Sequence, residues 1–178
     1  MATTTNTRWQ VCFITGGGSG IGRQLALMLA ADGADTALFD LAVSASVRDE
    51  VAYAGSGRVV VHEVDVCDEH AVARAVAAAV AELGSPSLVV NSAGISRNER
   101  FETSSLADFE LTLRVNLIGS RNVATAVLPH MTAGSRLALI ASLAGITGGY
   151  TYAAYAASKA GVIGLAKVLR VEYAPRQI

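Results

Sequence analysis

Short apolar runs alternate with segments of helical periodicity along the whole chain. The apolar runs predict five strands, at 11–15, 36–40, 58–66, 88–91 and 137–141. The intervening patterns predict five helices: from the glycine-rich run after residue 15 to about residue 31, then 45–54, 68–83, about 105–128 and about 151–173. Gly33 fits the end of the first predicted helix, and Asp68 fits the N-cap of the helix 68–83. Pro129 and Pro175 fit the ends of the last two predicted helices.

Several predicted strands are continuously apolar rather than alternating. Such runs are typical of strands that are covered on both faces of a sheet. Strands that alternate with helices then indicate an α/β fold, here a Rossmann-type doubly wound parallel sheet. In these sheets ligands bind at the carboxyl ends of the strands.

Composition limits the chain to one globular domain without a strong charge preference. It has 178 residues, of which 52% are hydrophobic and 16% charged, and a formal net charge of −1. This balance gives no global attraction to nucleic acid or to an anionic membrane. We expect a flexible N-terminal tail at 1–10 and one domain at 11–178.

Three features bear on location. The stretch 137–158 carries no charge, but its glycines, serine and threonines argue against a membrane-spanning helix. The N-terminal residues are polar and do not resemble a signal peptide. Two cysteines cannot build a disulfide framework, so a cytoplasmic protein is expected.

The glycine-rich run TGGGSGIG at 15–22 lies between the first strand and the first helix. Glycine tolerates positive φ and lets backbone N–H groups approach a pyrophosphate at the positive end of a helix. The run therefore predicts a dinucleotide-binding loop, although a tight turn without a ligand would use similar residues. The candidate contacts are Gly16, Gly18, Ser19, Gly20, Ile21 and Gly22.

Asp40 ends the second predicted strand, 18 residues after Gly22. A carboxylate there can accept hydrogen bonds from the adenine ribose hydroxyls and would repel a 2′-phosphate. No basic residue follows at Leu41 or Ala42. NAD(H) is therefore favoured over NADP(H), and Arg23 is the one nearby residue that argues the other way.

Tyr155 and Lys159 lie four residues apart on the last predicted helix, so their side chains share a face. Tyrosine normally titrates near ~10, which makes it a poor proton carrier at neutral pH. An ammonium about 4 Å away favours the phenolate by roughly 4 kcal/mol at an effective dielectric of ~20 but by only ~1 kcal/mol in water. A tyrosine general acid or base at this spacing therefore requires a partly dry site.

An ordered set of motifs resembles the short-chain dehydrogenase/reductase family. The set comprises TGGGSGIG, NSAG at 91–94, Asn116, Ser142 and the Tyr155–Lys159 pair, and Tyr155 follows Ser142 by 13 positions. Tyr-x-x-x-Lys alone would be weak evidence, whereas the order and separations together are specific. The resemblance covers the chain after about residue 10.

The resemblance implies a role for each matching residue. Tyr155 would be the general acid or base during hydride transfer, and Lys159 would assist it and bind the nicotinamide ribose. Ser142 would bind the substrate oxygen, and Asn116 would hold a water that relays protons. Cofactor contacts are implied for Leu41, Asp65, Val66, Asn91, Ala93 and Gly94. Ser92 departs from the family, which usually has asparagine there.

The resemblance and the sequence also bear on self-association and metal binding. Family members commonly pair through the helices that would contain Asn116 and Tyr155, so a homodimer or homotetramer is expected. The small residues Ala154, Ala157, Ser158, Gly161 and Gly164 fit such a contact or, alternatively, close packing within the chain. The three histidines lack metal-ligand spacing, so no metal site is expected.

The expected function is that of an NAD(H)-dependent oxidoreductase interconverting a secondary alcohol and a ketone. The family's C-terminal strands and substrate-covering segment are absent from these 178 residues. We therefore expect an apolar fifth strand at the sheet edge, a wetter catalytic site and poor turnover. A non-catalytic dinucleotide-binding protein or inactive fragment of the same fold, and more weakly an NADP-dependent reductase, are the alternatives.

Overall fold

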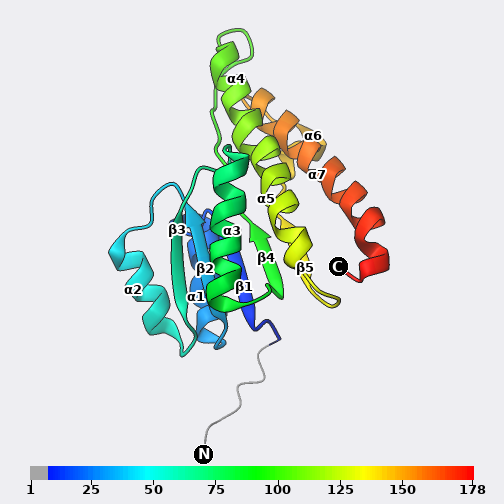
Figure 1. The fold of residues 1–178 in the computed structure, drawn as a ribbon. Coiled ribbons are helices and arrows are strands. Elements are labelled where there is room, and N and C mark those ends of the chain that lie inside the picture. Colours follow the sequence, from blue (N-terminus) through cyan, green and yellow to red (C-terminus); the bar gives the residue numbers. More distant parts are fainter. Residues whose placement is uncertain (1–7) are drawn as a thin grey trace, which may run out of the picture.

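Five parallel strands form the centre of the computed structural model, which describes residues 8–178 (Figure 1). They are β1 (Val11–Thr15), β2 (Asp35–Asp40), β3 (Val59–Glu63), β4 (Leu88–Asn91) and β5 (Arg136–Leu139). Their order across the sheet is β3-β2-β1-β4-β5, and every neighbouring pair is parallel. The predicted Rossmann-type sheet is therefore confirmed.

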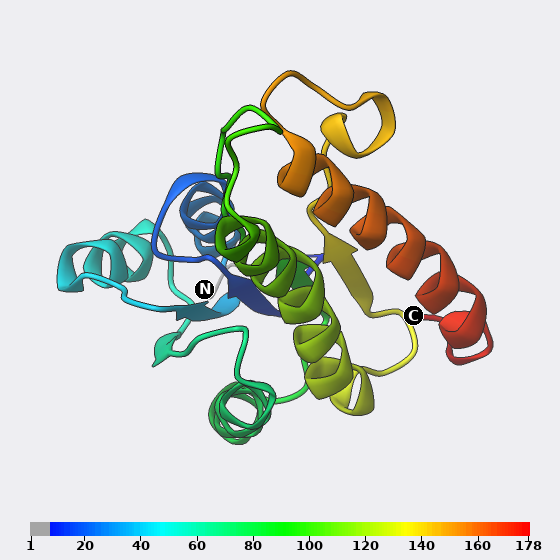
Figure 2. The ribbon, with the colours of Figure 1, turned by 90° about the horizontal axis from the view of Figure 1, so that it is seen from above.

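Helices cover both faces of this sheet (Figures 1 and 2). They are α1 (Gly20–Ala31), α2 (Ala45–Ala54), α3 (Glu69–Leu83), α4 (Leu106–Leu113), α5 (Gly119–Val127), α6 (Ala144–Thr147) and α7 (Ala153–Tyr173). Short helical turns η1 (Arg114–Ile118), η2 (Leu128–His130) and η3 (Ala174–Arg176) complete them.

Alternating residues of the central strands enter two separate cores. Phe13 and Phe39 pack with the inward faces of α3 and α5, which contribute residues such as Val76 and Val123. Ile14 and Leu38 point to the opposite face and pack with α1 and α2. Both faces of the sheet are thus dry, which explains the continuously apolar strands.

The structure corrects several predicted boundaries. The third strand ends at Glu63 instead of residue 66, and the fifth ends at Leu139 instead of 141, because the chain turns away to form loops at the sheet's carboxyl edge. The short helix α6 was not predicted. The predicted helix at 105–128 is interrupted by the π-helical turn η1, which contains Asn116.

The N-terminal prediction falls mainly on residues 1–7, which lie outside the described part of the chain. Gln10, the last residue of the predicted tail, contacts the sheet. Its carbonyl oxygen accepts a hydrogen bond of 2.9 Å from the backbone N–H of Asp35, the first residue of β2.

β5 is an edge strand, as expected. A hollow of about 400 Å³ lies between it and the C-terminal half of α7, lined by residues that include Leu137, Leu169 and Tyr173. On α7 itself, a methyl group added at Gly161 would come within 2.7 Å of Leu117. Part of the small-residue face is therefore used for packing within the chain.

Candidate functional site

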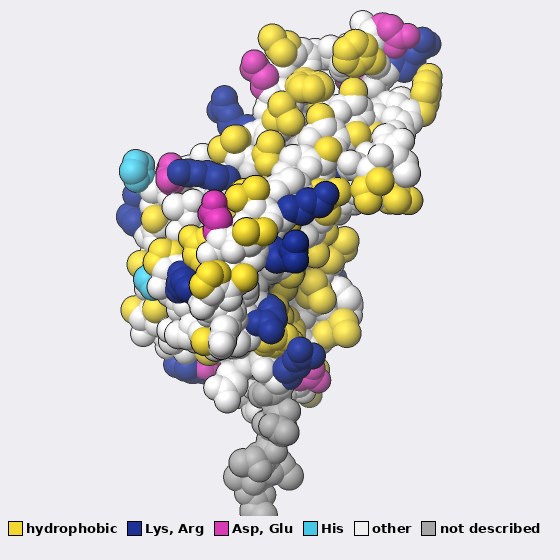
Figure 3. Space-filling view, turned by 90° about the vertical axis from the view of Figure 1, so that its right-hand side faces the viewer, with side chains coloured by type: hydrophobic (Ala, Val, Ile, Leu, Met, Phe, Trp, Pro, Cys, Tyr) yellow, Lys and Arg dark blue, Asp and Glu magenta, His cyan; other side chains and the backbone are white. Residues whose placement is uncertain are grey.

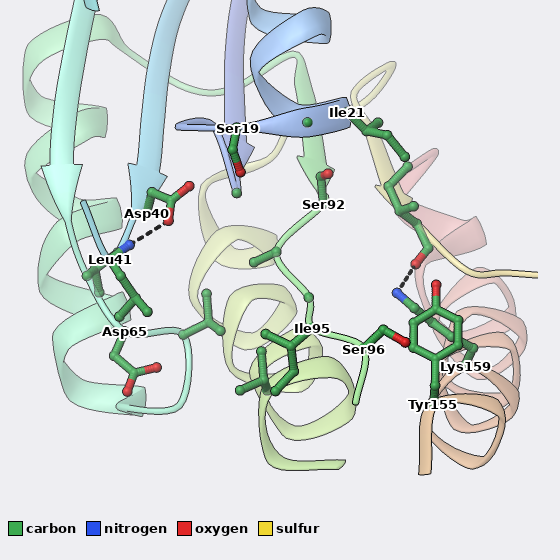
Figure 4. Close-up of a pocket in the computed structure, with 18 residues that line it drawn as sticks. Ser19, Ile21, Asp40, Leu41, Asp65, Ser92, Ile95, Ser96, Tyr155 and Lys159 are labelled. Carbon is green, nitrogen blue, oxygen red and sulfur yellow. Dashed lines mark hydrogen bonds between the residues drawn. The ribbon is translucent and has the colours of Figure 1, made fainter. Parts of the chain in front are cut away.

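A cavity of about 380 Å³ opens at the carboxyl ends of the strands (Figure 4). Asp40 and Asp65 lie at one end of it, and Tyr155 and Lys159 lie at the other. Twelve predicted site residues line it: Gly16, Ser19, Gly20, Ile21, Asp40, Leu41, Asp65, Val66, Ala93, Gly94, Tyr155 and Lys159. Residues far apart in sequence thus meet in one site.

The glycine loop is shaped by close backbone contacts. Gly16 has a φ of +68°, and a Cβ atom there would lie 2.9 Å from the Ala93 nitrogen. A Cβ atom at Gly22 would lie 2.2 Å from the Gly16 carbonyl oxygen. Gly22 does not line the cavity; it allows α1 to approach the loop that does.

The N-terminus of α1 differs from those of its neighbours. Ser44 caps α2 and Asp68 caps α3 through side-chain oxygens that accept backbone N–H groups. Ser19 makes no such bond, and the first turn of α1 has no acidic residue. Because Ser19, Gly20 and Ile21 line the cavity, this uncapped helix end can receive an anion.

Asp40 closes the loop from the side of β2. Its two oxygens accept hydrogen bonds from the backbone N–H groups of Gly18, at 2.9 Å, and Leu41, at 2.7 Å. Gly18 is thereby held beside the cavity without lining it. Arg23 is directed elsewhere, because its guanidinium pairs with Glu50 on α2.

Lys159 is only 5% exposed, and its Nζ donates a 2.7 Å hydrogen bond to the Ile140 carbonyl oxygen. Burial lowers the pKa of this lysine from its ordinary value. The Nζ atom lies 5.6 Å from the centre of the Tyr155 ring. The ring of Tyr152, at the start of α7, packs against Tyr155 with centres 5.7 Å apart. The dry setting that the Tyr–Lys pair requires is present around the ammonium group.

Besides Gly18 and Gly22, three predicted site residues do not line the cavity: Asn91, Asn116 and Ser142. Asn91 is 3% exposed, and its side chain bonds Thr15 and Ser120 instead of facing the cavity. Asn116 is fully buried and exchanges two hydrogen bonds with the Ile95 backbone, at 2.8 and 2.9 Å.

Ser142 lies beyond the end of β5, at the turn into α6. Its hydroxyl oxygen accepts a 3.2 Å hydrogen bond from the Ala144 N–H. The hydroxyl proton has no acceptor among the bonds of the described residues, so it can be donated to a ligand.

Sequence reasoning missed other residues of the site. The cavity is also lined by Val64, Ser92, Ile95, Ser96, Val115 and Ile140. Thr15, Ser120 and Ser158 lie just behind it, each with its hydroxyl hydrogen-bonded. Thr15 begins the TGGGSGIG motif and Ser158 falls within the Tyr-x-x-x-Lys motif, whereas no sequence signal marked Ser120.

The cysteines and the acidic residues suggest no second chemistry. Burial raises the pKa of Cys12 to about 12, and burial together with Asp65 raises that of Cys67 to about 11, so neither is activated. Within residues 8–178, no cluster of three His, Cys, Asp or Glu side chains could hold a metal ion. Across the same residues, no helix is long and apolar enough to cross a membrane.

The sequence also matches a known protein family. The family model described as short chain dehydrogenase covers residues 10–178. The chain belongs to this family. The predicted resemblance is thereby confirmed, and the relatives that the chain matches include dehydrogenases and reductases.

Several short-chain dehydrogenases resemble the chain over most of its length. A 3-oxoacyl-[acyl-carrier-protein] reductase of Thermotoga maritima is 33% identical, with 95% of this chain and 70% of the relative aligned. D-threitol dehydrogenase of Mycolicibacterium smegmatis is 36% identical, over 95% of this chain and 66% of the relative.

Solved structures agree with the fold. Carveol dehydrogenase from Mycobacterium avium in complex with NAD has a TM-score of 0.88 at 29% identity, over 94% of this chain and 66% of that one. A short-chain dehydrogenase from Mycobacterium paratuberculosis bound to NAD has a TM-score of 0.89 at 28% identity, over 94% and 68%. The chain spans 63% of a short-chain type dehydrogenase/reductase of Mycobacterium tuberculosis.

Proposed function

We propose that the chain carries the cofactor site and catalytic residues of an NAD(H)-dependent oxidoreductase that interconverts a secondary alcohol and a ketone. One observation carries the proposal. A single cavity joins an uncapped helix N-terminus and the Asp40 carboxylate to the Tyr155–Lys159 pair. The first two groups suit a dinucleotide, and the pair suits proton transfer at a substrate oxygen.

The residues at the β2 end of the cavity fit NAD(H). The free N–H groups of α1 suit the pyrophosphate, and Asp40 can accept the adenine ribose hydroxyls. A 2′-phosphate beside Asp40 would be repelled, and Arg23 is neutralised by Glu50. Asp65 and Val66 border the place for the adenine, and Ala93 and Gly94 border the path toward Tyr155. NAD bound in two structural relatives agrees with this assignment.

The other end of the cavity would perform the chemistry. The bound nicotinamide supplies or accepts the hydride. Tyr155 gives a proton to the substrate oxygen or takes one from it, and the Lys159 ammonium stabilises the ionised tyrosine and can bond the ribose. Ser142 offers its hydroxyl proton to the same substrate oxygen.

Asn116 would support the proton relay that the resemblance implies. Its Nδ2 donates to the Ile95 carbonyl oxygen and to the Ser158 hydroxyl, and its Oδ1 accepts from the Ile95 N–H, so this side chain also holds the architecture of the site.

The test is Tyr155→Phe, assayed with NADH and a panel of ketones such as cyclohexanone, 2-butanone and acetoacetate. We expect turnover to fall by about 10³-fold, because general acid–base catalysis contributes on this scale. The dissociation constant for NADH, measured by fluorescence, should stay within about twofold, since the change removes one hydroxyl group.

Three outcomes would contradict the proposal. Unchanged turnover in the variant would mean that Tyr155 is not the proton carrier. NADH binding without turnover in the unaltered chain would favour the non-catalytic binding protein. Tighter binding of NADPH than of NADH would instead favour the NADP-dependent reductase.

We also propose self-association, as a homodimer or homotetramer, through α4–α5 and α7. Ile118, Val168 and Val171 are 48–66% exposed on these elements. Figure 3 views the molecule from the side of α7 and shows hydrophobic side chains among Lys and Arg side chains. Light scattering should give a multiple of the 18.3 kDa chain mass, and Val168→Asp with Val171→Asp should shift it to the monomer.

A further inference from the structure

Ser158 links the helix that carries Tyr155 to a different helix. Its hydroxyl donates a 2.7 Å hydrogen bond to the Tyr155 carbonyl oxygen, one turn earlier on α7. The same oxygen accepts a 2.9 Å hydrogen bond from Nδ2 of Asn116, on η1. Both Ser158 and Asn116 are 0% exposed, so water does not compete for these bonds.

The arrangement differs from that of an ordinary serine within a helix. Such a serine commonly bonds a carbonyl of its own preceding turn, which only satisfies the hydroxyl. Here a second bond reaches the hydroxyl from an amide that is itself fixed by both backbone groups of Ile95. Because Ile95 lines the cavity, the first turn of α7 is tied to another part of the cavity wall.

The buried hydrogen bonds continue to the glycine loop. The backbone carbonyl oxygen of Asn116 accepts a hydrogen bond from the Ser120 hydroxyl. This hydroxyl in turn accepts a hydrogen bond from Nδ2 of Asn91. The Asn91 Oδ1 atom accepts from Thr15, the residue that precedes Gly16. A continuous path of side-chain bonds thus joins β1, β4, α5, η1 and α7, with Ser158 as its last member.

We propose that Ser158 is a positioning residue that holds Tyr155 at the place where it meets the substrate oxygen. The inference rests on the proposed function, since it assigns how that function's proton carrier is fixed. Ser158 does not line the cavity and touches no ligand there. Its hydroxyl bonds the backbone carbonyl of Tyr155 and thereby fixes the position of the Tyr155 phenol hydroxyl.

The first test is Ser158→Ala, assayed with NADH and the same ketone panel. We expect kcat to fall by about 10- to 100-fold, since displacements of about 1 Å cost rates of this order. The dissociation constant for NADH should stay within about twofold, because the glycine loop and Asp40 are untouched. Ser158→Cys keeps a weak donor and acceptor, so its kcat should lie between that of Ser158→Ala and that of the unaltered chain.

The matched control is Ser135→Ala. Ser135 is also buried, at 3% exposure, and its hydroxyl also makes two hydrogen bonds, accepting from the Thr132 N–H and donating to the Pro86 carbonyl oxygen. This variant removes a comparable pair of bonds away from the cavity. We expect its melting temperature to fall as much as that of Ser158→Ala while kcat stays unchanged.

A second measurement does not need turnover. The chain is labelled with 3-fluorotyrosine, and the ¹⁹F resonance of Tyr155 is assigned by its loss in Tyr155→Phe. Ser158→Ala should shift or split this resonance, whereas Ser135→Ala should leave it in place.

The outcomes separate this inference from the proposed function. If the unaltered chain binds NADH but reduces no ketone while the resonance responds to Ser158→Ala, the proposed function fails and the positioning role stands. If turnover depends on Tyr155 but Ser158→Ala changes neither kcat nor the resonance, the positioning role is overturned. Equal kcat losses in Ser158→Ala and Ser135→Ala would likewise overturn it, as a general loss of stability.

Discussion

The two ends of the cavity are built in different ways. At the β2 end, the cavity is lined mainly by the glycine loop and by Asp40, which a single β1–α1–β2 unit supplies, and Asp65 and Val66 join them from the loop after β3. At the α7 end, the groups are side chains whose places depend on buried hydrogen bonds between residues 21 to 76 positions apart.

This difference separates binding from chemistry. A pyrophosphate needs several N–H groups pointing the same way, and a glycine loop before a helix provides them locally. Proton transfer needs one hydroxyl placed accurately, and a side chain on a long helix gains such accuracy only when the helix is fixed from outside. Substitutions at the β2 end should therefore weaken the affinity for the dinucleotide, whereas substitutions at the α7 end should lower the turnover rate.

Gly22→Ala is expected to give the largest effect, and to affect the β2 end of the cavity without affecting the α7 end. The new methyl group would stand 2.2 Å from the Gly16 carbonyl oxygen, so α1 and the loop must move apart. We expect the NADH dissociation constant to rise by about 30-fold or more, as overpacking costs of about 2 kcal/mol imply. The Tyr155 fluorine resonance should not change.

Gly164→Ala is the matched control for this change, because a methyl group at Gly164 meets nothing within 4 Å. It should leave NADH affinity unchanged. An affinity loss in Gly164→Ala equal to that in Gly22→Ala would show that the loop is not the sensitive element.

Asp40→Ser tests the β2 end more finely. The change removes a charged acceptor and the repulsion of a 2′-phosphate, so the ratio of NADPH to NADH dissociation constants should fall by about 10- to 100-fold. Titration by fluorescence measures both constants. Asp32→Ser removes an exposed carboxylate outside the cavity and should leave the ratio unchanged; a ratio unaffected by Asp40→Ser would remove the basis for the NAD(H) assignment.

Lys159→Met tests the α7 end through stability, with the smallest expected effect. Burial lowers the pKa of Lys159, so its charged form opposes folding, and this opposition fades as pH rises through the folded-state pKa toward the unfolded value near ~10.4. The unfolding free energy of the unaltered chain, measured in urea, should therefore rise relative to that of the variant as pH increases above 7.

Lys167→Met, on an exposed position of the same helix, is the control. Its unfolding free energy should run parallel to that of the unaltered chain over the same pH range. A parallel course for Lys159→Met as well would show that the buried ammonium does not oppose folding.

Much of the fold could be predicted because its signals are local. The strand 11–15, the helix 45–54 and the strand 88–91 were predicted with the bounds that the structure has. The interruption at Asn116 was not predicted, because the sequence around it remains compatible with an ordinary helix. Its turn forms where Asn116 bonds Ile95 and Ser158, two contacts that exist only after folding.

The candidate site divides in the same way. The sequence by itself determined the glycine loop, Asp40 and the Tyr155–Lys159 spacing, since each depends on residues close together on one strand–helix unit or one helix. Only the tertiary structure decided that Asn91 turns inward, that Arg23 is taken by Glu50, and that Ser158 joins two helices. The physical reason is that a buried hydroxyl or amide takes whichever partner the packing brings within reach, and no local pattern specifies that partner.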